Sequence, residues 1–103
     1  MLYQQGDVLI RKINGVPNDA KEVKPENGRF ILARGEATGH HHSVPTEGAS
    51  LFECPDGLVL HCDVEVQIDH QEHNPITIPI GDYQILPVRE YNHFQEEIRE
   101  VVD

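Results

Sequence analysis

Apolar and polar residues alternate with a period of two over several short stretches, which is the pattern of strands with one buried face. In residues 63–69, for example, Val64, Val66 and Ile68 would point inward between polar neighbours. Val8 and Ile10 would likewise share one face of a strand, as would Tyr83 and Ile85 of a later one. The pattern predicts strands at residues 7–13, 29–34, 38–44, 50–54, 58–62, 63–69, 76–78 and 82–90.

Turn-forming residues separate these stretches. Residues 14–28 are rich in Gly, Pro, Asn and Asp and predict the longest loop, while Pro55-Asp56-Gly57 predicts a hairpin turn. Residues 70–75 are polar and end in Asn-Pro, which is typical of a turn or a strand end. Residues 91–103 suit either a short helix or a closing strand, and we favour the strand.

Short strands separated by turns predict an all-β protein, either a small β-barrel or a β-sandwich, with at most one short helix near the C-terminus. The 103 residues are enough for one compact domain, so we expect a single β domain over residues 1–103. We expect no membrane span and no signal peptide, and therefore a cytoplasmic protein, because no long apolar run or basic leader is present.

The net charge is −10, from 18 acidic residues against eight Lys and Arg. This charge argues against ordinary nucleic-acid binding and against binding to anionic membranes, both of which need a basic surface. An acidic surface favours solubility, and it would also suit a basic protein partner or the imitation of a nucleic acid. Homo-oligomer formation stays open.

Cys54 and Cys62 lie on the two strands that flank the predicted Pro55-Asp56-Gly57 turn. In that hairpin Cys54 opposes Leu58 and Cys62 opposes Ser50, so the two sulfurs would stand about 13 Å apart along the ladder. That separation is beyond the reach of a disulfide. We therefore expect both cysteines to be reduced, buried and apolar in character.

Three of the seven histidines, His40, His41 and His42, are consecutive and lie inside the chain, and His70 and His73 follow about thirty residues later. On a strand, alternation puts His40 and His42 on one face, roughly 6.6 Å apart, and turns His41 away. If the second pair folds back over the first, imidazoles can converge on one ion. The spacing thus predicts metal ligands at His40, His42, His70 and His73.

Imidazole suits several divalent transition metals, and we consider zinc, iron, nickel and manganese. Glu36 and Glu72 are candidate carboxylate ligands or supports of the ligands, and His41 is a further candidate. The alternative is that the histidines are solvated loop residues. His61 is interpreted as an ordinary strand histidine, and His93 as a solvent-facing one.

One resemblance concerns the His-x-His pair and a later Pro-x-Gly turn. Gly35 precedes His40 and His42, Glu47 lies five residues after His42, and Pro79-Ile80-Gly81 supplies the turn. This arrangement resembles the cupin superfamily and implies a β-barrel with a histidine-bound metal that acts on a small molecule. Tyr83 and Gln84 stand where a cupin would carry its third histidine.

The chain as a whole also resembles a group of small, uncharacterised bacterial and phage proteins. The shared segments run over most of the chain and are Gln5-Gly6-Asp7-Val8-Leu9, Gly35-Glu36-Ala37-Thr38-Gly39-His40, His70-Gln71-Glu72-His73, Ile78-Pro79-Ile80-Gly81-Asp82-Tyr83 and Arg89-Glu90-Tyr91. This resemblance implies no activity.

Three functions follow as hypotheses. The first is a small β-barrel protein that binds a divalent metal through clustered histidines, with catalysis left open. The second is a cupin-like metalloenzyme acting on a small molecule. The third is an acidic interaction protein, such as a nucleic-acid mimic or a phage-type inhibitor.

Overall fold

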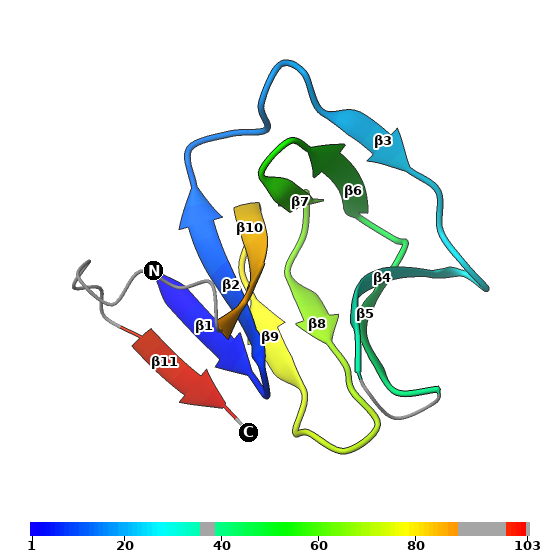
Figure 1. The fold of residues 1–103 in the computed structure, drawn as a ribbon, viewed down its shortest axis with the longest axis vertical. Coiled ribbons are helices and arrows are strands. Elements are labelled where there is room, and N and C mark those ends of the chain that lie inside the picture. The colour runs from blue at the N-terminus through cyan, green and yellow to red at the C-terminus, as the bar shows by residue number, and fades with distance from the viewer. Residues whose placement is uncertain (36–38, 89–98, 103) are drawn as a thin grey trace.

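The computed structural model describes residues 1–35, 39–88 and 99–102, and this part of the chain is built from strands (Figure 1). It contains no helix long and apolar enough to cross a membrane. Every element of the described residues is a strand, so the expected all-β fold is confirmed for them. The strands are β1 Leu2–Gln5, β2 Val8–Ile13, β3 Lys21–Val23, β4 Arg29–Arg34, β5 His41–Pro45, β6 Ala49–Cys54, β7 Gly57–Cys62, β8 Val66–Ile68, β9 Ile76–Ile78, β10 Gly81–Pro87 and β11 Arg99–Val102.

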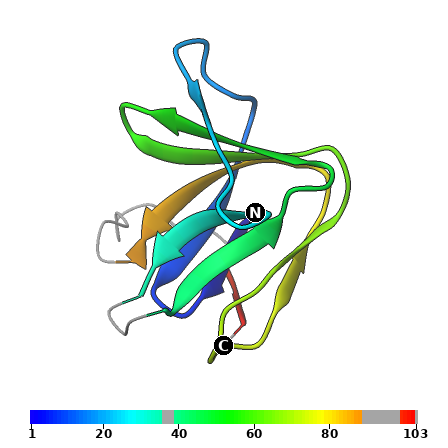
Figure 2. The same cartoon turned by 90° about the vertical axis from the view of Figure 1, so that its right-hand side faces the viewer.

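Seven strands form one sheet in the order β11-β1-β2-β10-β7-β6-β3, and two separate ribbons pair β4 with β5 and β8 with β9. All neighbours are antiparallel except β1 and β11, which run parallel. The β4–β5 ribbon faces the β1–β2 part of the large sheet across the core (Figures 1 and 2). No ladder among the described residues joins the ribbons to that sheet, so the barrel is not closed.

The hydrophobic core lies between the large sheet and the two ribbons, since all three contribute buried side chains to it. Full burial of such a side chain is worth roughly 1.5–3 kcal/mol, which no two-stranded ribbon could obtain alone. The core residues are Tyr3, Val8, Ile10, Phe30, Leu32, Val44, Leu51, Leu60, Cys62, Val66, Ile68, Ile76, Ile78, Tyr83 and Ile85.

Several strands differ from the sequence prediction. The strands β1 and β3 were not predicted, because neither Leu2-Tyr3-Gln4-Gln5 nor Lys21-Glu22-Val23 alternates. Strand β8 begins only at Val66, so Val64 precedes it and is 47% exposed instead of buried. In the tail, the predicted strand is confirmed for β11, while residues 89–98, where a short helix was the alternative, lie outside the described residues.

The β6–β7 hairpin corrects the predicted register by one residue. Cys54 pairs with Gly57 and Cys62 pairs with Ala49, so the turn consists of Pro55 and Asp56 alone. Gly57, at φ 119°, begins β7 in a conformation that favours glycine. Both cysteines are free thiols as predicted, but only Cys62 is buried, whereas Cys54 is half-buried.

Candidate functional site

The two histidine segments meet through a single antiparallel bridge. The backbone N–H of Ser43 donates to the carbonyl of Asp69 over 3.0 Å, and the N–H of Asp69 donates back over 2.8 Å. In an antiparallel pairing the next residues, His42 and His70, then face each other. Their ring centroids are 4.4 Å apart.

The other two predicted ligands join the same cluster. The ring centroid of His70 is 5.8 Å from that of His40 and 4.6 Å from that of His73, and the rings of His42 and His73 lie 6.1 Å apart and nearly parallel. The structure thus brings together His40, His42, His70 and His73, which we call the histidine group.

His73 also lies over the turn between β1 and β2. Gly6 occupies this two-residue turn with φ 57°, which fits the first central position of a type II′ turn. A Cβ atom at Gly6 would stand 2.5 Å from Nε2 of His73, so a side chain at this position would require the His73 ring to move. The glycine therefore allows the second histidine segment to reach the first turn of the chain.

Gln5, at the end of β1, is completely buried behind the histidine group. Its amide nitrogen donates to the carbonyls of Ile68 over 3.0 Å and of Asn74 over 2.9 Å. These two acceptors fix the orientation of the amide, so it is the Gln5 oxygen that lies 2.8 Å from Nδ1 of His42. An amide oxygen only accepts hydrogen bonds, and Nδ1 of His42 must therefore carry the proton.

Nε2 of His42 is consequently the nitrogen with the free lone pair while the ring is neutral. This atom is buried and has no hydrogen-bond partner within the described part of the chain. Burial first, and then the neighbouring His70, lower the pKa of His42 to about 4, with Asp7 acting in the opposite direction. A neutral ring is thus expected at neutral pH.

A carboxylate oxygen lies close to that lone pair. Oδ1 of Asp7 lies 3.4 Å from Nε2 of His42, although the Asp7 side chain itself is 80% exposed. Two electron-rich atoms at this separation repel each other unless a proton or a cation lies between them. Burial disfavours a proton on Nε2 of His42.

The remaining candidates lie around this centre. Nδ1 of His70 accepts the backbone N–H of Glu72 over 3.0 Å, and burial followed by the charges of His73 and His40 lowers the pKa of His70. The largely exposed Glu72 has Oε1 at 3.5 Å from Nδ1 of His40. Glu72 is therefore close enough to act on the histidine group from its outer side.

His41 makes its contacts elsewhere. Its backbone N–H donates to Oε1 of Gln71 over 2.8 Å, and its ring nitrogen Nδ1 lies 3.5 Å from Nε2 of the same side chain. Glu36 and His93 lie outside the described residues.

As the side chains stand, no three His, Cys, Asp or Glu residues in the described ranges are arranged to hold a metal ion together.

Sequence reasoning missed two residues of this centre, Gln5 and Asp7. They flank Gly6 in a Gln-Gly-Asp turn and lie in the Gln5-Gly6-Asp7-Val8-Leu9 segment shared with the uncharacterised proteins, but neither feature indicates that Gln5 is buried.

A second ionic cluster surrounds His61 on β7. Nδ1 of His61 lies 2.5 Å from Oδ1 of Asp82 on β10, and Nε2 lies 2.8 Å from Oδ1 of Asp63. Hydrogen bonds to both carboxylates, with Asp82 the stronger influence, raise the pKa of His61. Its interpretation as an ordinary strand histidine missed both carboxylates.

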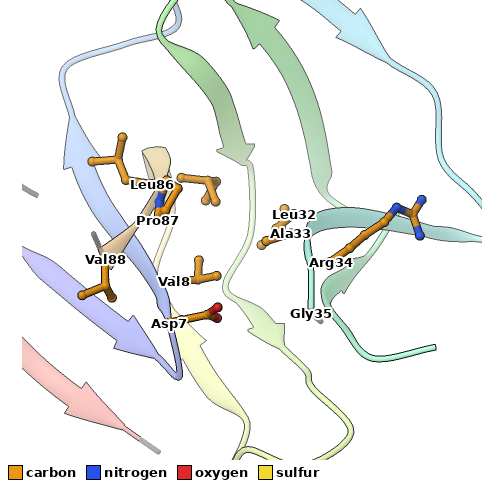
Figure 3. Close-up of a pocket in the computed structure, with 10 residues that line it drawn as sticks. Asp7, Val8, Leu32, Ala33, Arg34, Gly35, Leu86, Pro87 and Val88 are labelled. Atoms are coloured by element: carbon orange, nitrogen blue, oxygen red, sulfur yellow. The ribbon is translucent and has the colours of Figure 1, made fainter. Parts of the chain in front are cut away.

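A groove of about 590 Å³ opens beside the histidine group, between β2 and β10 on one side and β4 on the other (Figure 3). Asp7 lies at this groove as well as next to His42. The residues that line it are Asp7, Val8, Leu32, Ala33, Arg34, Gly35, Ile85, Leu86, Pro87 and Val88.

The fold and the site define a small all-β domain with a polar centre in which the buried Gln5 and His42 are grouped with three half-buried histidines. The chain belongs to a family described as a domain of unknown function, DUF8820, which matches residues 4–87. This span contains Gln5, Asp7 and the whole histidine group. No curated protein and no solved structure matches the chain significantly.

The Gln5 amide should be a large contributor to stability. Gln5→Leu removes the partners of two carbonyls and of the His42 N–H, so we expect the free energy of unfolding in urea to fall by about 2 kcal/mol or more. Gln67→Leu is the matched control, because the Gln67 amide donates to Asp69 in an exposed hydrogen bond. The control should change the unfolding free energy by less than about 0.5 kcal/mol. Equal losses in the two variants would contradict this role of Gln5.

The His61 cluster predicts a pH-dependent stabilisation. Because the pKa of His61 is raised in the folded state, its contribution is fully present below the unfolded value of about 6.5 and is lost as the pH rises through the folded pKa. The difference in unfolding free energy between the wild type and His61→Gln should therefore be larger at pH 5.5 than at pH 9. Urea titrations at the two values measure it, and a difference that grows with pH would show the opposite sign.

Proposed function

We propose that this protein binds one divalent transition-metal ion at the histidine group. His40, His42, His70 and His73 would supply imidazole nitrogens, and Asp7 a carboxylate. The observation that carries the proposal is the buried lone pair of His42 Nε2, which faces the Asp7 carboxylate with no hydrogen-bond partner in the described part of the chain.

The hydrogen bond from Nδ1 of His42 to Gln5 is of the kind that metal-binding histidines make. A ligand histidine typically donates its second ring N–H to a carbonyl or carboxylate, which fixes the tautomer and makes the ligating nitrogen more basic. The Gln5 oxygen fills this role at 2.8 Å. A cation beside Nε2 would also turn the repulsion between the His42 lone pair and Asp7 into two attractive interactions.

Binding would require the outer ligands to reorient. The lone pair on Nδ1 of His70 is now used by the Glu72 N–H, and the ring of His73 lies parallel to that of His42. Both residues belong to the connection between β8 and β9, where side-chain rotation disturbs no ladder. His42 would serve as the preorganised ligand, and His70 and His73 would close on the ion.

The donor set favours borderline metals such as zinc, nickel and iron over calcium or magnesium, because imidazole dominates it. Manganese would gain most from the Asp7 carboxylate. Glu72, next to His40, is the candidate for a further carboxylate or for an outer hydrogen-bond acceptor. The second candidate function is a cupin-like enzyme that would use the same ion to act on a small molecule. The groove beside Asp7 favours this candidate, because it could hold such a molecule.

Metal retention tests the proposal directly. Protein prepared without an affinity tag is equilibrated with Zn²⁺ or Ni²⁺, desalted and measured by elemental analysis. We expect about one ion per chain in the wild type, and a loss of retained metal of at least about tenfold in His40→Ala and in His73→Ala, since each removes a ligand. His61→Ala is the control, because His61 is paired with Asp63 and Asp82 outside the histidine group.

His40 and His73 are only half-buried, so these variants should fold, and circular dichroism checks that they do. Stoichiometric metal in the double variant His40→Ala/His73→Ala would overturn the site. A wild type that retains no metal would do so as well and would favour the acidic interaction protein instead.

A further inference from the structure

We propose that Asn14 is a site of spontaneous modification, at which asparagine converts to isoaspartate and aspartate, and that the fold protects Asn27 from the same reaction. Both asparagines precede a glycine, in Asn14-Gly15 and in Asn27-Gly28. Both are exposed, so access to water does not distinguish them. The inference goes beyond the proposed function and does not depend on a metal ion.

The reaction needs only the chain and water. The backbone nitrogen that follows the asparagine attacks the side-chain carbonyl carbon and forms a C–N bond. The bond from that carbon to the amide nitrogen breaks, and the amide leaves as ammonia with the proton of the attacking N–H. Water then opens the cyclic imide at either carbonyl and leaves a carboxylate, as aspartate or as isoaspartate. Glycine in the second position favours the attack, because it carries no side chain beside the attacking nitrogen.

Asn27 and Gly28 are the two central residues of a tight turn. Their φ values are 51° and 77°, and the flanking Glu26 and Arg29 exchange two backbone hydrogen bonds of 2.8 and 3.0 Å. These features define a type I′ turn, in which both central residues are left-handed. A left-handed asparagine directs the following nitrogen away from its own side chain. Asn27 must therefore leave this conformation before the ring can close, which breaks both hydrogen bonds.

Side chains hold the same turn in place. The guanidinium of Arg29 donates to Oγ of Ser43 over 2.8 Å and to Oδ2 of Asp69 over 2.8 Å. On the other side of the turn, Arg34 donates to the carboxylate of Glu26. Rotation of the Asn27 backbone would thus strain contacts that reach β4, β5 and the end of β8.

The segment after β2 lacks these restraints. Asn14 lies outside the left-handed region, and no described residue beyond the chain neighbours comes within 4 Å of where a Cβ of Gly15 would stand. Outside the ladders, no backbone hydrogen bond in the described part of the chain involves residues 14–16. This segment connects β2 to β3, along an outer part of the molecule (Figure 1). Asn14 can therefore reach the conformation for ring closure without breaking a described backbone hydrogen bond.

The modified chain remains compatible with the fold. Each event replaces a neutral amide by a carboxylate, so the net charge changes by one, from −10 to −11. Isoaspartate also adds one carbon to the main chain, directly after Ile13, which is the last residue of β2. No strand pairing is interrupted, so the modified protein should unfold at the same urea concentration as the wild type.

Timed incubation with peptide mapping tests the proposal. Tag-free protein is kept at pH 8 with a chelator, digested at intervals and analysed by mass spectrometry that separates isoaspartate from aspartate. In the native protein Asn14 should convert at least about tenfold faster than Asn27, because two hydrogen bonds must first open at Asn27. In concentrated urea the two rates should agree within about threefold, since the unfolded chain has lost the turn.

Asn14→Gln and Asn27→Gln are matched variants at exposed positions. Glutamine reacts far more slowly, because its longer side chain would have to close a larger ring. The gain of negative charge with time, followed by ion-exchange chromatography of the native protein, should largely disappear in Asn14→Gln. It should persist in Asn27→Gln.

Two results would overturn the inference. Equal rates at the two asparagines of the native protein, or faster conversion of Asn27, would contradict protection by the turn. An Asn14 that converts in urea but stays intact in the native protein would show that the segment after β2 is protected as well. Neither result bears on metal retention.

Discussion

The buried amide of Gln5 ties together the parts of the molecule on which the site depends. Through three hydrogen bonds it joins the end of β1 to the end of β8, to the connection before β9 and to His42 on β5. A buried amide is costly when unpaired, so each partner constrains the positions of the others. The tautomer of His42 is a direct consequence of this arrangement.

The backbone bridge between Ser43 and Asp69 acts in the same region. It joins the β4–β5 ribbon to the β8–β9 ribbon through the backbone. Both ribbons contact the large sheet through side chains in the core. Together the bridge and the amide bring two histidine segments, about thirty residues apart in the chain, to one place. The site is thus a product of tertiary structure, built where two ribbons meet the first hairpin.

Local sequence patterns were sufficient to predict part of the histidine group. Strand alternation predicted that His40 and His42 would share a face, although β5 begins only at His41 and His40 joins the group from just before the strand. A polar turn ending in Asn-Pro predicted where His70 and His73 would lie. Gln5 could not be predicted, because a glutamine on a strand is usually exposed and its partners lie 37 to 69 residues away. The hairpin register was missed because the role of Gly57 as turn or strand residue depends on its pairing with Cys54.

The central claim is that Gln5 holds His42 as a neutral ring with its proton on Nδ1. Long-range ¹H–¹⁵N correlation spectra of the imidazole rings at pH 7, with a chelator present, test it most directly. The account predicts a protonated Nδ1 and an unprotonated Nε2 for His42, and the loss of this pattern in Gln5→Leu. A His42 ring protonated on Nε2, or on both nitrogens, would contradict it.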